Sequence, residues 1–254
     1  MKARFGIGVA ALAGLFALAG CGSDGDDLNA ASVNLSAPLI QIPAPNGGDW
    51  TQVVSETSEG GYRMGNPDAP VKLVEYASIT CPHCGEFAEA GSEELESVYV
   101  RSGQVSWEYR PFMIFPSDPG LFMLLRCQGP TPFFRLIDQL YESQREWSAR
   151  LQTLPEEQVR QAESLPANAK AAFYIRAGGL DAFFRQRGMP QARIDSCLAD
   201  ANGLTRLADM TRRSGEQDGI SGTPTFVVNG QTIEGIGPPY WPGVETRLRA
   251  AMGS

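Results

Sequence analysis

The residues best suited to chemistry in this sequence are two cysteines three positions apart, Cys81 and Cys84, with Pro82 and His83 between them. An apolar run over residues 71–77 precedes them and predicts a buried strand, and a polar, helix-compatible segment follows them. Cys81 is therefore expected at the first turn of a helix, with Cys84 one turn further on the same face, within disulfide distance. Pro82 suits the first helical position, where its missing N–H costs nothing.

This placement favours thiol–disulfide exchange. The thiolate is the reactive form of cysteine, and the unpaired N–H groups and positive dipole end of a helix stabilise it. His83 is the only histidine in the chain, and a protonated or N–H-donating imidazole would stabilise a Cys81 thiolate further. A stabilised thiolate is a good leaving group, so the disulfide form of this pair is expected to be a strong oxidant.

A Cys-x-x-Cys pair also occurs in structural zinc sites and in inert disulfides. A zinc site needs four ligands, and the sequence has no second Cys-x-x-Cys pair and no second histidine. We therefore expect neither a metal site nor a cofactor. An inert structural disulfide is the other alternative, although cysteines at a helix N-terminus with Pro82 and His83 between them are suited to exchange.

The segment over residues 75–87, Glu-Tyr-Ala-Ser-Ile-Thr-Cys-Pro-His-Cys-Gly-Glu-Phe, resembles the active site of the DsbA-like thiol–disulfide oxidoreductases of the thioredoxin superfamily. The likeness extends from about Trp50 to the C-terminus. It includes the segment 65–70, Gly-Asn-Pro-Asp-Ala-Pro, and the segment 222–226, Gly-Thr-Pro-Thr-Phe. The resemblance implies an α/β protein with a thioredoxin-like fold and an inserted helical domain, in which Cys81 is attacked and Cys84 is the buried resolving partner.

The resemblance also assigns roles outside the cysteine pair. It implies that Glu75, inside an otherwise apolar strand, is a buried carboxylate that moves protons during exchange; the alternative is a half-exposed strand glutamate. It implies a cis peptide bond before Pro224, with Thr223 offering backbone hydrogen bonds to an extended substrate. Threonine before this proline is more typical of disulfide isomerases and of some other DsbA-like proteins than of DsbA itself, so the direction of exchange stays open.

The sequence divides into five segments. Residues 1–20 are expected to be a signal peptide, 21–49 a lipid-anchored flexible tether, 50–117 the first thioredoxin-like part, 118–215 the inserted helical domain and 216–254 the second thioredoxin-like part with the cis-proline loop. In the tether, the sequence Leu-Ile-Gln-Ile over residues 39–42 is the one sign of a segment that packs on the domain. The active-site helix is predicted over 82–102, with one apolar face formed by Phe87, Gly91, Leu95 and Val98.

The N-terminal residues have the features of an export signal. Lys2 and Arg4 precede an apolar run of 15 residues, Phe5 to Ala19, which is too short for an ordinary transmembrane helix. The following sequence, Leu-Ala-Gly-Cys over 18–21, resembles the lipobox of bacterial lipoproteins, which implies cleavage before Cys21 and acylation of that residue. The alternative is an ordinary signal peptide with a chance cysteine. Both predict a protein outside the cytoplasm, and acylation would anchor it to a membrane in the periplasm.

The five cysteines fit an exported protein. If Cys21 carries lipid, four cysteines remain, and proximity pairs Cys81 with Cys84. Cys127 and Cys197 are then expected to form a structural disulfide, and two buried free thiols are the alternative.

The net charge is −8, and it becomes −10 without residues 1–20, so nonspecific binding to nucleic acid is not expected. The expected partners are exported proteins with free thiols and a membrane redox partner that reoxidises the pair. We expect a monomer, because residues 22–49 are too short for the dimerisation domain of known isomerases. A disulfide isomerase or reductase, and a non-catalytic metal-binding or chaperone lipoprotein, are the alternative functions.

Overall fold

The computed structural model of the chain describes residue 2 and residues 33–253. The predicted signal peptide (apart from Lys2), the lipidation site Cys21 and the first part of the predicted tether lie outside the described residues. Within the described chain, no helix combines the length and the apolar character needed to cross a membrane.

The centre of the fold is a mixed sheet of six strands in the order β1-β2-β4-β3-β5-β6. Strands β3 and β4 run parallel, and every other neighbouring pair is antiparallel. The strands are β1 (Val54–Glu56), β2 (Tyr62–Gly65), β3 (Val71–Ala77), β4 (Val105–Pro111), β5 (Thr225–Val228) and β6 (Gln231–Thr232). Asn229 and Gly230 both have positive φ angles, which suit the tight turn between β5 and β6.

The helix after β3 begins as α1 (Pro82–Phe87) and continues through two π-helical stretches, η4 (Ala88–Ser92) and η5 (Leu95–Val100). Phe87, Gly91 and Leu95 of the predicted apolar face are buried, but Val98 is 39% exposed and Tyr99 is buried instead. A π-helical turn holds more residues than an α-helical turn. The buried face therefore moves on by one residue, and the prediction for Val98 was wrong.

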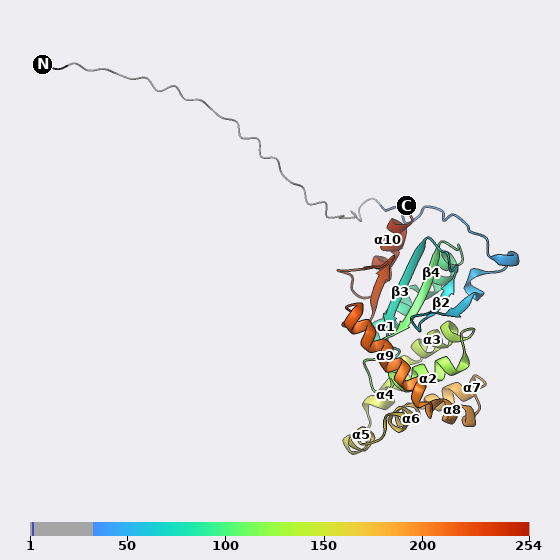
Figure 1. Cartoon of the computed structure of the whole chain (residues 1–254), viewed down its shortest axis with the longest axis vertical. Helices are drawn as coiled ribbons and strands as arrows, with labels where there is room; N and C mark the ends of the chain where they lie inside the picture. Colours follow the sequence, from blue (N-terminus) through green and yellow to red (C-terminus); the bar gives the residue numbers. More distant parts are fainter. Residues whose placement is uncertain (1, 3–32, 254) are drawn as a thin grey trace.

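Helices α2 to α9 are inserted between β4 and β5 and form a second layer past the ends of the long strands (Figure 1). Proline occupies the N-cap of α3, α5, α6 and α8, since it can precede a helix but not continue one. The helices are α2 (Asp118–Gln128), α3 (Phe133–Glu142), α4 (Gln144–Gln152), α5 (Glu156–Glu163), α6 (Ala167–Ala177), α7 (Leu180–Gln186), α8 (Gln191–Leu198) and α9 (Ala201–Gln217). The predicted domain end at residue 215 falls inside α9.

One hydrophobic core joins the sheet to the helices. The ring of Trp107 on β4 lies 4.7 Å from that of Phe134 on α3, and the ring of Tyr109 lies 5.8 Å from that of Phe133. The chain ends in α10 (Trp241–Ala251), whose Trp241 also packs against this core. The fold is thus thioredoxin-like with a helical insertion, and the inserted helices share the core of the sheet.

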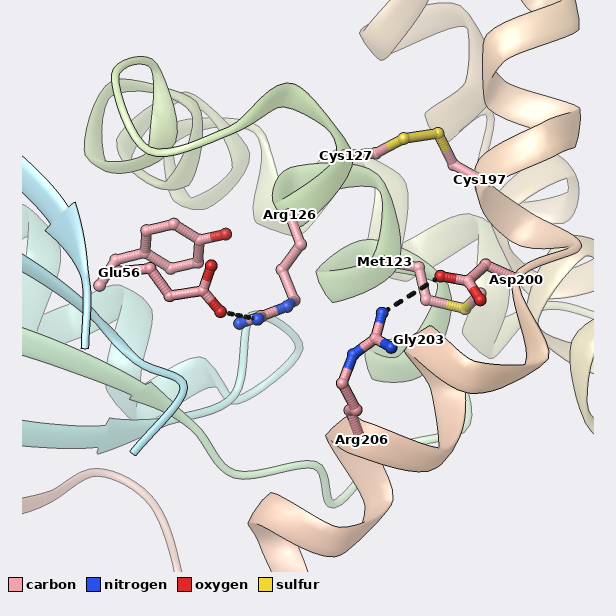
Figure 2. A pocket seen from close by; sticks show the side chains of 9 residues that line it. Glu56, Met123, Arg126, Cys127, Cys197, Asp200, Gly203 and Arg206 are labelled. Carbon is pink, nitrogen blue, oxygen red and sulfur yellow. Dashed lines mark hydrogen bonds and ion pairs between the residues drawn. A yellow bond between two sulfur atoms is a disulfide. The ribbon is translucent and has the colours of Figure 1, made fainter. Parts of the chain in front are cut away.

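A disulfide joins Cys127, near the end of α2, to Cys197, near the end of α8, with a Cα–Cα distance of 6.2 Å. Figure 2 shows a pocket of about 230 Å³ beside it. The guanidinium groups of Arg126 and Arg206 point into this space, and each pairs with a carboxylate, that of Glu56 and that of Asp200. The pocket therefore offers no unpaired positive charge to a ligand.

The segment before the sheet is not the free tether that the sequence predicted up to residue 49. Its backbone carbonyl groups accept hydrogen bonds from side chains of the domain: Ala37 O from Arg249, Ile40 O from Gln104 (2.9 Å) and Ile42 O from Trp50 (2.7 Å). The N–H of Ile42 donates to Ser102 O at 2.7 Å. Two short 3₁₀ helices follow, η2 (Pro45–Gly47) and η3 (Trp50–Gln52). Residues 37–42 thus dock at the end of the sheet where β4 begins.

Candidate active site

Cys81 and Cys84 lie at the end of β3, where the chain enters α1, and both thiols are free. Cys81 is the N-cap residue of α1 and is 4% exposed, while Cys84 is fully buried one turn later. The thiol of Cys81 donates a hydrogen bond to the carbonyl oxygen of Thr223 at 3.3 Å. The peptide bond between Thr223 and Pro224 is cis, and β5 begins at the next residue. The structure thus brings the cysteine pair and the Thr223–Pro224 loop together.

The surroundings of Cys81 favour its thiolate. A hydrogen bond from the Cys84 thiol is the main cause, and together with smaller contributions it lowers the pKa of Cys81 to about 6 against the opposing effect of burial. The smaller contributions come from the Thr223 side chain and from the backbone N–H groups of Cys84 and His83. The two backbone N–H groups belong to the first turn of α1, where N–H groups have no hydrogen-bond partner within the helix.

Cys84 is in the opposite situation. Burial raises the pKa of its thiol well above the usual range, and the hydrogen bond to Cys81 and the charges of Cys81 and Glu75 raise it further. One sulfur of the pair is therefore held as an anion at neutral pH while the other keeps its proton. A pair with this difference can use Cys81 for attack and Cys84 as the protonated partner.

Glu75 lies inside the protein on β3 and is 1% exposed. Its carboxylate accepts a hydrogen bond from the indole N–H of Trp107 at 3.2 Å. Burial raises the pKa of Glu75 to about 8, with the charges of Asp138 and Cys81 acting in the same direction. This burial excludes the alternative of a half-exposed strand glutamate. A carboxyl group that titrates near neutral pH can both accept and donate a proton, so a role in proton transfer stays the prediction for Glu75.

The imidazole of His83 is turned toward Glu86. Its Nδ1 lies 2.8 Å from Oε2 of Glu86, and the side chain is 53% exposed. The hydrogen bond to Glu86 raises the pKa of His83, and the Cys81 charge contributes less. The sequence predicted that the imidazole would stabilise the Cys81 thiolate, but the hydrogen bond that Cys81 receives from His83 comes from its backbone N–H.

Asp118 was not singled out from the sequence as a site residue. It is fully buried at the first position of α2, and its carboxylate accepts hydrogen bonds from the hydroxyl groups of Ser78 and Thr80, each at 2.9 Å. It also accepts from the N–H groups of Ile114 and Phe115. Asp118 therefore fixes the loop before Cys81 from the side of the helical domain.

Two further residues of the helical domain hold the same loop. The side-chain amide of Gln144 donates to the carbonyl oxygens of Ile79 at 2.7 Å and Cys81 at 2.9 Å. The hydroxyl of Tyr141 donates to the carbonyl oxygen of Ser78 at 3.1 Å. No pattern in the sequence marked Tyr141 or Gln144, because their partners lie more than 60 residues earlier in the chain.

The described residues contain no group of three or more His, Cys, Asp or Glu side chains arranged to hold a metal ion. The two thiols of Cys81 and Cys84 are thus surrounded by a buried acid, Glu75, and by a loop over residues 78–81 that hydrogen bonds from the helical domain hold in place.

The sequence model of the family described as thioredoxin matches residues 57–239. The chain therefore belongs to the thioredoxin family. A crystal structure of a protein-disulfide isomerase from Novosphingobium aromaticivorans is similar with a TM-score of 0.68 and 30% identity, over 73% of this chain and 96% of that one.

Two more distant proteins are also similar. The crystal structure of Wolbachia pipientis α-DsbA1 has a TM-score of 0.57 at 19% identity, over 84% of this chain and 96% of that one, and so shares the fold. A Rickettsia bellii protein whose name describes a protein-disulfide oxidoreductase is 26% identical over 184 residues, or 72% of this chain. The match spans 62% of the length of that relative.

Proposed function

We propose that the protein is a thiol–disulfide oxidoreductase that introduces or exchanges disulfides in exported proteins through Cys81 and Cys84. The observation that carries this proposal is the opposite ionisation of two sulfurs one helical turn apart, with the pKa of Cys81 lowered to about 6 and that of Cys84 raised by burial. A structural disulfide or a metal site gains nothing from such a difference, whereas exchange depends on it.

In the oxidising direction, a substrate thiolate attacks the sulfur of Cys81 in the Cys81–Cys84 disulfide. The disulfide breaks, a mixed disulfide forms between substrate and Cys81, and the Cys84 sulfur leaves with the electron pair and takes up a proton from Glu75. A second substrate thiolate then attacks the substrate sulfur of the mixed disulfide and releases Cys81 as a thiolate. The substrate has lost two electrons and the cysteine pair has gained them, so a membrane redox partner must reoxidise the pair.

The substrate is proposed to bind along the loop at Thr223 and Pro224. The carbonyl oxygen of Thr223 lies 3.3 Å from the Cys81 sulfur, and this backbone can pair with an extended polypeptide in the manner of an added strand. Such pairing holds a substrate cysteine beside Cys81 without selecting a particular sequence.

Disulfide isomerisation is a second candidate function. It is favoured by the threonine at position 223 and by the similarity to a solved structure titled a protein-disulfide isomerase. The two functions use the same chemistry and differ in the resting redox state of Cys81 and Cys84.

We also propose that the protein works in the periplasm, carried there by a signal peptide over residues 1–20 and anchored through acylated Cys21. The support for this is the lipobox-like sequence ending at Cys21. The disulfide between Cys127 and Cys197 suits an oxidising compartment, and we assign it a structural role.

The test is the equilibrium of the Cys81–Cys84 couple with glutathione. A potential near −120 mV, the figure typical of a strong oxidant, supports oxidation of substrates, while one near −270 mV points to reduction. A Cys81→Ser variant is the control in the same assay. A couple that does not equilibrate with glutathione would exclude the proposed function.

A further inference from the structure

Gln144 is the first residue of α4, and it is buried, with 7% of its surface exposed. Its side-chain nitrogen donates hydrogen bonds to the carbonyl oxygens of Ile79 and Cys81, at 2.7 and 2.9 Å. Among the hydrogen bonds of the described chain, the one from Gln144 to Cys81 O links the helical domain to the backbone of Cys81. The contact joins a residue outside the thioredoxin-like part to the proposed nucleophile.

A glycine on the active-site helix makes room for this side chain. A Cβ atom at Gly85 would lie 2.7 Å from Oε1 of Gln144, closer than real contacts allow. The amide plane of Gln144 therefore lies directly against the backbone of α1. The N–H of Gly85 also donates to the carbonyl oxygen of Cys81, at 3.3 Å, so this carbonyl has one partner from its own helix and one from Gln144.

We propose that Gln144 is a positioning residue for the exchange reaction, which stabilises the Cys81 thiolate by holding the carbonyl groups of Ile79 and Cys81. A carbonyl oxygen carries the negative end of a dipole, and a donor bonded to it offsets that partial charge close to the sulfur. The same bonds fix Cys81 in the extended backbone conformation of an N-cap, with φ −70° and ψ 120°.

That conformation matters because it places the sulfur of Cys81 where the backbone N–H groups of His83 and Cys84 stabilise its anion. Gln144 thus acts on the sulfur through the backbone and does not touch it. The inference rests on the proposed function, since it takes Cys81 as the sulfur that attacks and is attacked.

Other ionisable groups also act on Cys81, and a test must leave them in place. They are Cys84 and His83 on the active-site helix, Glu75 on β3, and Tyr240 just before α10. Substitution of Gln144 changes none of these side chains, so a change in the ionisation of Cys81 can be assigned to the two hydrogen bonds.

The experiment uses two variants of the full chain, Gln144→Leu and Gln144→Glu. Leucine removes both donors at similar volume, and glutamate keeps the shape of the side chain but cannot donate when ionised and adds a negative charge. The pKa of Cys81 is measured from thiolate absorbance in the ultraviolet. We expect it to rise by about one unit in Gln144→Leu, a tenfold change in the ionisation constant, and by more in Gln144→Glu.

The equilibrium with glutathione gives a second readout that a purely structural role would not move. Loss of thiolate stability makes the reduced form less favourable, so both variants are expected to be weaker oxidants than the wild type. If the pKa rises from about 6 to about 7, the equilibrium constant for reduction falls about fivefold at pH 7. Thermal unfolding of both redox forms is measured in parallel.

The matched control is Gln152→Leu, the same change at an exposed position at the other end of α4. It is expected to leave both the pKa and the equilibrium constant unchanged. Gly85→Ala is an independent perturbation, which keeps Gln144 but crowds its amide, and it is expected to shift both readouts in the direction of Gln144→Leu. It also serves as the test if the Gln144 variants do not fold.

The inference is overturned if the Gln144 variants, or Gly85→Ala in their place, keep the wild-type pKa and equilibrium constant, even with a lower melting temperature. A different failure is recognised in the wild type itself. If its Cys81 ionises like a free cysteine, near pH 8.5, the proposed function fails before Gln144 comes into question.

Discussion

The molecule contains two cysteine pairs that differ in almost every physical respect. Cys81 and Cys84 lie three residues apart with free thiols, and Cys127 and Cys197 are separated by 70 residues and joined in a disulfide. A disulfide between Cys81 and Cys84 would join two residues that the helix already holds close together. The second closes a long loop between α2 and α8. The first arrangement is suited to chemistry and the second to stability.

The ends of the helices explain much of this difference. Cys81 is the N-cap of α1, where orphan N–H groups and the positive end of the dipole stabilise an anion. Cys127 and Cys197 are each the residue before the last of their helices, α2 and α8. The negative end of a helix dipole opposes a thiolate there, and a poor leaving group makes a durable disulfide. The place of a cysteine along a helix can therefore decide whether it serves exchange or stability.

The largest effect is expected from removing the reactive sulfurs in turn. Cys81→Ser should abolish exchange, because Cys84 is buried and its raised pKa keeps it protonated. Cys84→Ser should instead accumulate a mixed disulfide, formed when the Cys81 thiolate attacks a substrate disulfide and releases one substrate thiolate, because no Cys84 thiol remains to displace the substrate from Cys81. Scrambled-ribonuclease refolding and non-reducing gels measure the two outcomes. Full activity in Cys81→Ser would contradict the assigned roles.

Replacement of the other pair should change stability instead of activity. The double variant Cys127→Ala and Cys197→Ala is expected to lose about 2–5 kcal/mol of unfolding free energy, the range for removal of a native disulfide. The potential of the Cys81–Cys84 couple should stay unchanged. Urea unfolding and glutathione equilibration measure the two quantities. A large shift of the potential would show that the two pairs are coupled.

Glu75 should give the protein a distinctive pH dependence. Its pKa is raised from 4.5 to about 8 in the fold, so the folded state holds a proton that the unfolded state has lost between these values. Its contribution to stability is present below pH 4.5 and falls as pH rises to 8, with a slope of up to about 1.4 kcal/mol per pH unit. Glu75→Gln should remove this slope. Urea unfolding of the oxidised form at pH 5, 7 and 9 compares the two proteins.

The same variant sharpens the mechanism. Without the proton of Glu75, release of Cys84 should slow by about 10²-fold, the lower range for general acid–base catalysis. Stopped-flow measurement of the exchange rate across the same pH range tests this. Equal rates in wild type and Glu75→Gln would leave Glu75 with a structural role only.

The smallest effect is expected at His83. Because its imidazole pairs with Glu86 and is half exposed, His83→Ala should raise the pKa of Cys81 by only a few tenths of a unit, in keeping with a weak, solvent-screened charge. Its backbone N–H, which contributes to the stability of the Cys81 thiolate, is retained in alanine. A rise of one unit or more would restore the imidazole as a main stabiliser of Cys81.

The elements around Cys81 were predictable because their signals are local. An apolar run, a cysteine pair and a proline identified β3 and the start of α1. The resemblance added the helical insertion between β4 and β5. Prediction of these features requires only residues within a few positions of one another, or a sequence pattern shared by a whole family.

The features that the sequence did not predict depend on distant partners. Asp118 and Gln144 act on residues about 40 and 60 positions away, and a polar residue in a helical segment carries no mark of such a contact. The exposure of Val98 depends on π-helical turns, which an α-helical period does not reproduce. The docking of residues 37–42 was visible only as a few apolar residues in a polar segment.

The docked segment, residues 37–42, also determines at which end of the sheet the N-terminal part of the chain joins the domain. Its contacts with Ser102 and Gln104 lie where β4 begins, and the reactive sulfur lies beyond the opposite end of the parallel strands β3 and β4. The docked segment therefore joins the domain at the end of the sheet opposite Cys81. In the anchored protein that we propose, the face that carries Cys81 stays clear of this attachment, so that a protein substrate can reach it.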